Sequence, residues 1–332
     1  MQNIRNLGRV RFPAAAIALL MLTCGTPPSA WCASKNLWVA NQNGVIESYD
    51  SKQLRKSGMP APVELNTTGS AQGLAFDKSK NLWATVHPDH SEVVQFAAAQ
   101  LKDLKHTPNP TPAVVISTDT TVVRDLFGCH FDSQGNLWIA DTQNGSLDEL
   151  SKAQLAAGSA EEVTPNIIIT SPDLFNAEFV TFDKDGNAWV SGSGEDTIAE
   201  FTASQLTSGG SKSATIVLTT DLCPEDMEFD KEGDLWVAGA CSDTVVKFAK
   251  SQLASSGSPT PTVTLDSASF SDDEPSGLAF DSSGDLLVAT FVGETISKLT
   301  PKQLKVSGAP VPKVVVTIPE AGDNQIIFGP AN

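Results

Sequence analysis

The chain has 332 residues, of which 40% are hydrophobic and 18% are charged. This composition excludes a disordered chain, since disorder requires low hydrophobicity together with high net charge. Lys and Arg number 22 against 39 Asp and Glu, and the net charge of −17 argues against binding to nucleic acid or to an anionic membrane, because both need clustered basic residues.

The first 33 residues have the pattern of a secretory signal peptide. A segment with three arginines precedes the apolar run AAAIALLML at 14–22, which is too short to span a membrane as a helix. We expect cleavage after Ala30 or Ala33, a mature chain of 34–332 without a transmembrane segment, and a periplasmic or extracellular location. Loss of the three arginines takes the net charge to −20. A lipid anchor on Cys24 is the alternative.

One phrase recurs through the rest of the chain. Its copies are LAFDKSKNLWATV (74–86), CHFDSQGNLWIAD (129–141), VTFDKDGNAWVSG (180–192), MEFDKEGDLWVAG (227–239) and LAFDSSGDLLVAT (278–290). A partial copy, KNLWVAN, stands at 35–41, and the complementary part, QIIFGP, stands at 325–330. After each copy, a large apolar residue is followed by a Gln-Leu pair, and the number of residues between them is the same in every repeat. The chain therefore contains six repeats.

Each repeat holds four short stretches with the composition of β-strands. In the fifth repeat they are 226–230, 234–239, 244–249 and 261–265, and a tight D-x-x-G hairpin joins the first two. Four strands per repeat predict an all-β fold, a six-bladed β-propeller with four-stranded antiparallel blades in one domain over 34–332. Because the chain ends supply complementary parts of one repeat, the C-terminal strand should close the first blade.

Most recurring residues have a structural explanation. The tryptophans should pack between neighbouring blades, the Gln-Leu pairs should form a helical turn with a buried Leu, and DKDGN at 183–187 should be a hairpin rather than a calcium loop. Cys223 and Cys241 fall in two loops on one face of the ring, which predicts a disulfide in an oxidising compartment. Cys129 aligns with apolar residues and should be a buried free thiol.

The mouth of the central channel is the expected ligand site. In each repeat, one residue stands just before the recurring phrase of the first strand. Around the ring these residues are Gln72, Phe127, Glu178, Glu225, Ser276 and Asn324. Their carboxylate and amide oxygens would suit one calcium or magnesium ion near the axis. A polar, water-filled mouth is the alternative. Asp226, Glu274 and Asp323 lie close in sequence and add negative potential in either case.

Histidines give a second candidate metal site. His87 and His90 lie in a loop on the same face as the channel mouth, and with a carboxylate they could bind zinc. Solvated surface histidines are the alternative, and His130 lies within the first strand of the third blade. The sequence has no G-x-S-x-G motif and no Gly-rich phosphate or dinucleotide motif.

The repeated FDxxGNLWVA phrase resembles NHL-repeat β-propellers, especially exported bacterial ones with the additional Gln-Leu element, over 35–330. The resemblance is more distant to virginiamycin B lyase and to the gluconolactonase and regucalcin group. In that group a divalent cation lies on the channel axis, so the resemblance implies Glu178, Glu225 and Asn324 as its ligands. The chain departs from the group at Ser276, where Asn usually stands, and the lyase histidines have no counterparts.

Two functions remain open from the sequence. The first is an exported, monomeric propeller that binds a protein, peptide or glycan through its loop-rich channel face. The second is a metal-dependent, lactonase-like hydrolase or lyase, in which the cation polarises a carbonyl and a carboxylate moves the proton. The first is favoured because no complete catalytic set of residues can be recognised.

Overall fold

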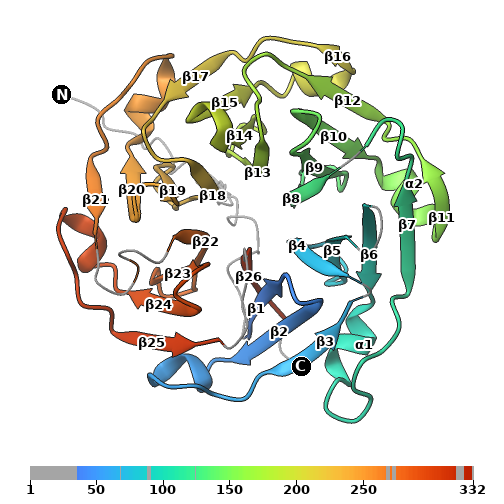
Figure 1. Cartoon of the computed structure of the whole chain (residues 1–332), viewed down its shortest axis with the longest axis horizontal. Coiled ribbons are helices and arrows are strands. Elements are labelled where there is room, and N and C mark those ends of the chain that lie inside the picture. Colours follow the sequence, from blue (N-terminus) through green and yellow to red (C-terminus); the bar gives the residue numbers. More distant parts are fainter. Residues whose placement is uncertain are drawn as a thin grey trace, which may run out of the picture.

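The computed structural model describes residues 36–330 apart from 68, 88–90, 124, 267–269, 271–273 and 319–324. Six sheets are arranged radially around one axis, which confirms the six-bladed β-propeller (Figure 1). The predicted signal peptide and Cys24 lie outside the described residues. Among those that are described, no helix is long and apolar enough to cross a membrane.

Blades 1 to 3 begin with the inner strand and end at the rim. Blade 1 contains β26 (Ile326–Gly329), β1 (Asn36–Asn41), β2 (Val45–Asp50) and β3 (Val63–Asn66). Blade 2 contains β4 (Ser70–Phe76), β5 (Leu82–His87), β6 (Glu92–Phe96), β7 (Val114–Thr118) and β11 (Ala160–Val163). Blade 3 contains β8 (Leu126–Phe131), β9 (Leu137–Asp141), β10 (Ser146–Leu150), β12 (Ile167–Thr170) and β16 (Gly210–Ser211).

Blades 4 to 6 follow the same order with four strands each. Blade 4 contains β13 (Ala177–Phe182), β14 (Ala188–Gly192), β15 (Thr197–Phe201) and β17 (Ile216–Thr219). Blade 5 contains β18 (Pro224–Phe229), β19 (Leu235–Gly239), β20 (Thr244–Phe248) and β21 (Val263–Leu265). Blade 6 contains β22 (Pro275–Phe280), β23 (Leu286–Thr290), β24 (Thr295–Leu299) and β25 (Val314–Thr317).

A short helical turn follows the third strand of every blade, as predicted. The turns are η2 (Gln53–Arg55), α1 (Ala98–Lys102), α2 (Lys152–Ala157), η4 (Gln205–Thr207), η5 (Lys250–Ala254) and η6 (Gln303–Lys305). Gln303 shows the reason for its recurrence: its Oε1 accepts the Thr300 N–H at 2.8 Å, and its Nε2 donates to the Val311 carbonyl at 2.6 Å. The other five glutamines make the same pair of bonds. The element is structural.

The FDxxGN phrase builds the hairpin between the first two strands and joins neighbouring blades. In blade 5 the Asp230 carboxylate accepts backbone N–H groups of its own turn and the indole N–H of Trp236 at 3.1 Å. Trp236 meets Phe280 of blade 6 edge-on, with ring centroids 6.2 Å apart. Equivalent Trp–Phe contacts recur at three other blade junctions. The predicted turn and the predicted packing of the tryptophans are both confirmed.

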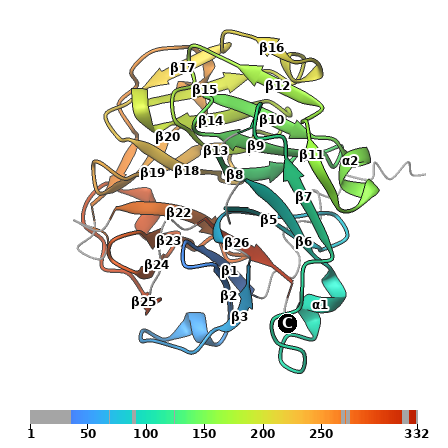
Figure 2. The same ribbon diagram turned by 45° about the vertical axis from the view of Figure 1, so that its right-hand side comes forward.

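The ends of the chain close the ring. Strand β26 pairs antiparallel with β1, with Leu37 opposite Phe328, so the C-terminal strand completes blade 1 as predicted. Gln325, just before β26, accepts the Leu74 N–H of blade 2 at 2.6 Å through its side chain. The buried apolar residues form clusters that combine side chains of adjacent blades, so the core lies between the blades. Figure 2 shows the sheets of neighbouring blades side by side around the ring.

One feature of the blades differs from the prediction of four antiparallel strands. In five blades the outer strand is joined, in parallel, by a segment of the following repeat. This segment forms β11 on blade 2 and β16 on blade 3, and it makes bridges at Gly257, Gly308 and Gly58 on blades 4, 5 and 6. It comes directly after the Gln-Leu turn, which carries the chain across to the neighbouring blade.

Candidate functional site

A β-bulge shapes the inner strand of five blades at the channel mouth. In blade 2 the residues Gln72 and Gly73 together lie opposite the single residue Thr85. The register shifts at the equivalent place in β8, β13, β18 and β22. A bulge re-aims side chains and is common beside binding sites. The first bulge positions are occupied by Gln72, Phe127, Glu178, Glu225 and Ser276, which are the residues that the sequence singled out.

Two oxygen atoms at this mouth are buried without a partner. The Oε1 of Gln72 and the Oγ of Ser276 have no hydrogen-bond partner among the described residues, and the two residues are 8% and 2% exposed. Gln72 uses its Nε2 to donate to Ser70 Oγ at 3.1 Å. Buried polar atoms in folded proteins are nearly always hydrogen-bonded. Oxygens on third strands, in Asp148, Glu200 and Ser297, also lack a partner among the described residues. The two oxygens at the mouth are therefore candidates for a bond to a ligand or to an ordered water.

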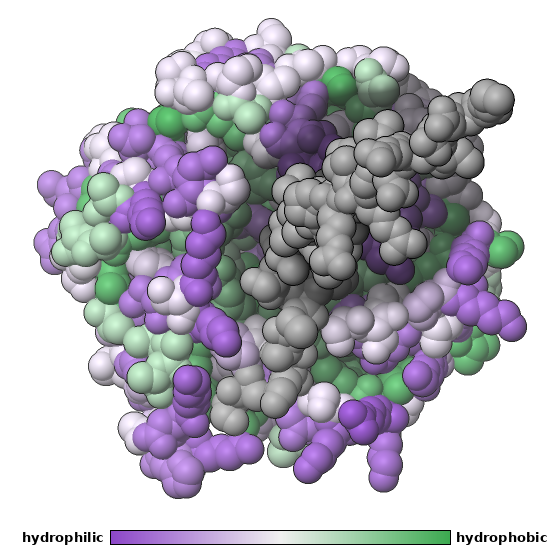
Figure 3. Space-filling view, turned by 180° about the vertical axis from the view of Figure 1, so that it is seen from behind, coloured by the Kyte–Doolittle hydropathy of each residue, from purple (hydrophilic) through white to green (hydrophobic). Residues whose placement is uncertain are grey.

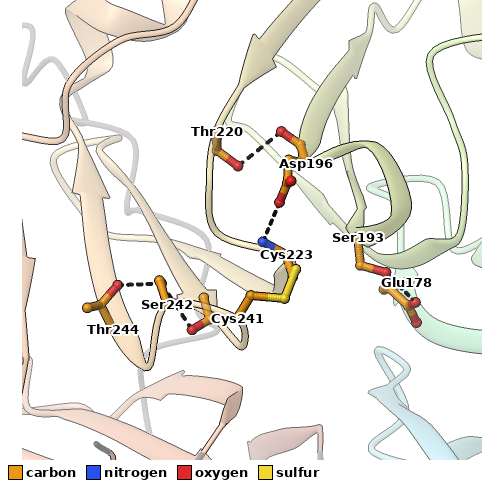
Figure 4. Close-up of a disulfide and its surroundings, with 9 residues drawn as sticks. Glu178, Ser193, Asp196, Thr220, Cys223, Cys241, Ser242 and Thr244 are labelled. Carbon is orange, nitrogen blue, oxygen red and sulfur yellow. Dashed lines mark hydrogen bonds between the residues drawn. A yellow bond between two sulfur atoms is a disulfide. The ribbon is translucent and has the colours of Figure 1, made fainter.

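Glu178 is hydrogen-bonded to a neighbouring turn at the mouth. Its Oε1 accepts the hydroxyl of Ser193 at 2.8 Å, from the turn between β14 and β15 (Figure 4). Glu225 occupies the same bulge position in blade 5 and is partly exposed. Asn324 and Asp323 lie outside the described residues. Glu274 lies directly before β22, and its N–H donates to the Asp243 carboxylate at 3.2 Å.

The second bulge position contacts a neighbouring blade: in blades 2 and 5 it contacts the next blade, whereas in blade 4 it is Phe179, whose ring packs edge-on against Phe127 of blade 3. Gly73 touches the backbone of blade 3, where a Cβ atom would lie 2.5 Å from the Phe127 carbonyl oxygen. Asp226 fills this position in blade 5, and its carboxylate accepts the N–H groups of Met227 at 2.9 Å and of Leu278 in blade 6 at 3.0 Å. Burial raises the pKa of Asp226 to about 7. Asp226 thus joins two blades, a role that the sequence did not reveal.

His87 and His130 form contacts between blades. His87 Nδ1 lies 3.0 Å from Asp125, and its Nε2 is bonded to the Leu126 carbonyl, so both ring nitrogens are engaged. Burial disfavours the charged ring, but these two bonds outweigh it and raise the pKa of His87. His130 lies 5.6 Å from the Phe182 ring, and burial lowers its pKa. His90, the other residue of the predicted zinc pair, lies outside the described residues.

The disulfide between Cys223 and Cys241 is present as predicted, with the two Cα atoms 5.3 Å apart. It joins the loop that leads into β18 to the turn after β19, both at the channel face (Figure 4). The Cys223 N–H also donates to Asp196 of blade 4 at 2.6 Å. Two blades and two loops are therefore fixed at one point. Cys129 is a buried free cysteine, as predicted.

The described residues supply only part of a ligand set for the predicted metal ion. Within the described part of the chain, no group of three or more His, Cys, Asp or Glu side chains is arranged to hold a metal ion. Glu178 and Glu225 stand on adjacent inner strands, but Glu178 is already bonded to Ser193. Calcium takes six to eight oxygen ligands, so amide groups and waters would have to supply the rest. The cation at this mouth stays a prediction.

The surface near the mouth also offers apolar contacts. Phe175, in the loop that leads into β13, and Val292, in the turn between β23 and β24, are each 55% exposed. Viewed from behind, hydrophilic, intermediate and hydrophobic residues are interspersed over the coloured part of the surface (Figure 3). A rigid polar mouth beside a few exposed apolar side chains is an arrangement typical of a recognition surface.

The comparisons with known proteins support the fold. No protein-family model and no curated protein match the sequence. A chain of a nidogen/laminin complex is similar, with a TM-score of 0.62 and 13% identity over 88% of this chain and 97% of that one. A protein of unknown function from Bacteroides caccae has a TM-score of 0.57, at 10% identity over 87% and 100%. A catalytically inactive virginiamycin B lyase from Staphylococcus aureus, solved with quinupristin, has a TM-score of 0.50, at 11% identity over 82% and 84%. These identities show a shared β-propeller fold alone, and membership of the NHL group stays a prediction.

Proposed function

We propose that the chain is an exported, monomeric, NHL-type β-propeller that binds a protein, peptide or glycan at its channel mouth. The observation that carries this proposal is a pair of buried oxygens, Gln72 Oε1 and Ser276 Oγ, that have no hydrogen-bond partner in the described part of the chain. They belong to blades 2 and 6, which lie on either side of blade 1 in the ring. A ligand that offers hydrogen-bond donors to both would recover the energy lost by leaving them unbonded.

The construction of the mouth supports a binding role. The candidate residues are held on bulged strands, whereas the loops around them are tied together by the Cys223–Cys241 disulfide and by hydrogen bonds between blades. Such a site loses little conformational freedom on binding. The disulfide also suits an oxidising compartment, in agreement with export. A nidogen/laminin complex has the same fold, so a protein ligand is compatible with it.

The test is a ligand selection with matched variants. The mature protein is screened against a displayed peptide library and a glycan array, and hits are titrated against Gln72→Ala/Ser276→Ala. We expect this double variant to bind at least tenfold more weakly. Lys184→Ala, on an exposed hairpin at the opposite face, should bind as wild type does. Equal binding by the double variant, or the absence of any hit, would contradict the proposal.

The alternative is a metal-dependent hydrolase or lyase. It is supported by the positions of Glu178 and Glu225 at equivalent bulges of adjacent blades. A bound calcium or magnesium ion would supply a Lewis acid at the mouth. Mass spectrometry of mature protein prepared without chelator measures the metal content directly. About one ion per chain, lost on Glu178→Ala, would favour this alternative, and no stoichiometric metal would count against it.

A further inference from the structure

The segment that reaches back to the preceding blade makes the same contacts in blades 4, 5 and 6. On blade 6, Gly58 donates its N–H to the Val315 carbonyl at 3.0 Å and accepts the Thr317 N–H at 2.9 Å. The Oγ of Ser57 accepts the Val315 N–H at 3.1 Å. The pairs Ser307-Gly308 and Ser256-Gly257 repeat these three bonds on blades 5 and 4. We call each such segment a Ser-Gly clasp.

Blades 2 and 3 carry variants of the clasp. On blade 2, Ser159 Oγ accepts the Val115 N–H at 3.0 Å, and the following residues form β11. On blade 3, Gly210 and Ser211 form β16 parallel to β12. The three glycines of the regular clasps have φ of +140°, +151° and +143°, a conformation that other residues rarely adopt. The requirement for glycine is therefore conformational.

Blade 1 is the exception. Its outer strand β3 has no partner beyond β2 among the described residues, and its sheet has four strands. By register, Glu64 corresponds to Val315 and Asn66 to Thr317. The Glu64 N–H and C=O and the Asn66 N–H therefore point outward. No described residue hydrogen-bonds to these three groups. Glu64 is exposed, whereas its five counterparts, Val115, Ile168, Val217, Thr264 and Val315, are partly covered.

The second repeat explains why this edge is open. After Gln100-Leu101 the chain continues as Lys102-Asp103-Leu104-Lys105, with no Ser-Gly pair. Leu104 turns inward and is 2% exposed, in the same apolar cluster as Leu65. The chain then returns to β7 through the Pro-rich loop at 107–112 without pairing with β3. Figure 1 shows α1 beside this strand at the rim of the molecule.

We propose that the outer edge of blade 1 is a docking site for an extended segment of another protein that carries a Ser-Gly pair next to basic residues. The segment would lie parallel to β3, take the place of the missing clasp, and bond to Glu64 and Asn66 as the other clasps bond to their blades. Addition of a strand to an open sheet edge is an established mode of peptide binding. The five clasps of this chain are already paired within its own ring, so the partner is a different protein.

The preference for basic residues follows from the charges at the edge. Glu64 lies directly opposite Glu47 of β2, and Glu47 is buried and bonded to the Tyr49 hydroxyl at 2.6 Å. Like charges at opposite positions of a sheet destabilise the pair. A Lys or Arg beside Glu64 would offset this repulsion. Within the chain, the clasp at 55–62, RKSGMPAP, has Arg55 and Lys56 directly before its Ser-Gly pair.

The probe is a synthetic peptide with the sequence of residues 55–62, titrated into the mature protein and followed by amide NMR. We expect the Glu64 and Asn66 amide resonances to shift to saturation. Asn66→Pro removes one outward N–H on an edge strand, where proline is tolerated, and should weaken binding at least tenfold. Asn66→Thr, which keeps that N–H and matches Thr317, should bind as wild type does. A peptide with valine in place of its glycine should not bind.

Several results would overturn the proposal. They are no saturable shift at millimolar peptide, equal binding by Asn66→Pro, or shifts confined to the channel face. A wild-type dimer seen by sedimentation and lost on Asn66→Pro would also overturn it, because the occupant would then be a second copy. If Glu64 serves only to keep the edge unpaired, wild type binds no peptide and Glu64→Val associates with itself.

Discussion

At the scale of single residues, the two bulge positions of the inner strand differ in how much they vary and in what they contact. The first position differs in chemistry from blade to blade, from Gln72 and Ser276 to Glu178. The second contacts a neighbouring blade: it is a glycine in blades 2, 3 and 6, Phe179 in blade 4, and the hydrogen-bond acceptor Asp226 in blade 5. Aligning the repeats identifies both positions. It does not reveal the bulge or the hydrogen bond by which Asp226 joins two blades.

Asp226 makes the stability of the protein depend on pH. Burial raises its pKa to about 7, so the folded chain keeps a proton that the unfolded chain releases near pH 4. Stability therefore falls as the pH rises from about 4 to 7, by at most ~1.4 kcal/mol per pH unit for one proton. Raised pKa values of Glu228 and His87 act in the same direction.

We expect Asp226→Asn to reduce this dependence. Its unfolding midpoint should change less than that of wild type between pH 5 and pH 7, because one of the proton-linked groups is gone. Glu232→Gln, on an exposed turn, serves as the control and should keep the wild-type slope. Thermal unfolding at four pH values measures both. An unchanged slope in Asp226→Asn would show that Asp226 does not hold a proton in the folded state.

At the scale of elements, loops that are far apart in sequence become one rigid face. Cys223 adopts a positive φ of 47° and is held by Asp196 of the previous blade and by the disulfide to Cys241. The sequence predicted the pair because both cysteines fall in loops of one face of a single blade. It did not predict the bond from Asp196, because this bond depends on how adjacent blades pack.

The disulfide should contribute substantially to stability. It closes a loop between residues 18 apart, which corresponds to about 3 kcal/mol in the chain-entropy model. Cys223→Ser/Cys241→Ser should lower the free energy of unfolding by about this amount in urea titrations. Reductant should shift the wild-type midpoint and leave that of the double variant unchanged. A wild-type midpoint that stays constant after both thiols are shown to be reduced would contradict this expectation.

At the scale of the whole molecule, the ring depends on two short ends meeting in one blade. Deletion of 325–332 removes β26 and the side-chain bond from Gln325 to Leu74, and it exposes the edge of β1. We expect the shortened protein to aggregate or to unfold without cooperativity, because the exposed edge of β1 can pair with other chains. Deletion of 331–332 alone leaves β26 in place and is the control. Equal unfolding midpoints in scanning calorimetry would contradict the role of this closure.

The fold could be predicted almost completely, because the repeats appear directly in the sequence and their number, order and incomplete ends determine the ring. The rim could not be predicted, since a Ser-Gly pair has no propensity that distinguishes a clasp from an ordinary turn. The second repeat lacks this pair. The lack could be interpreted only once the structure showed the corresponding segments of the other five repeats, three clasps and two variants, paired with neighbouring blades. The site stays a prediction: Gln72, Glu178, Glu225 and Ser276 lie at equivalent bulged positions, a placement that could be expected from the alignment of the repeats. Whether these residues bind a ligand depends on their individual side chains, which differ from repeat to repeat, and the alignment of repeats gives only their positions.

The most direct test of the channel-mouth proposal is hydrogen–deuterium exchange of the mature protein with and without a ligand obtained from the screen. Binding at the mouth predicts protection of the turns at 142–145, 193–196, 240–243 and 291–294, with unchanged exchange in the opposite hairpins at 132–136, 183–187, 230–234 and 281–285. Protection of the hairpins with unchanged exchange at the mouth would show that the ligand binds elsewhere and would contradict the account.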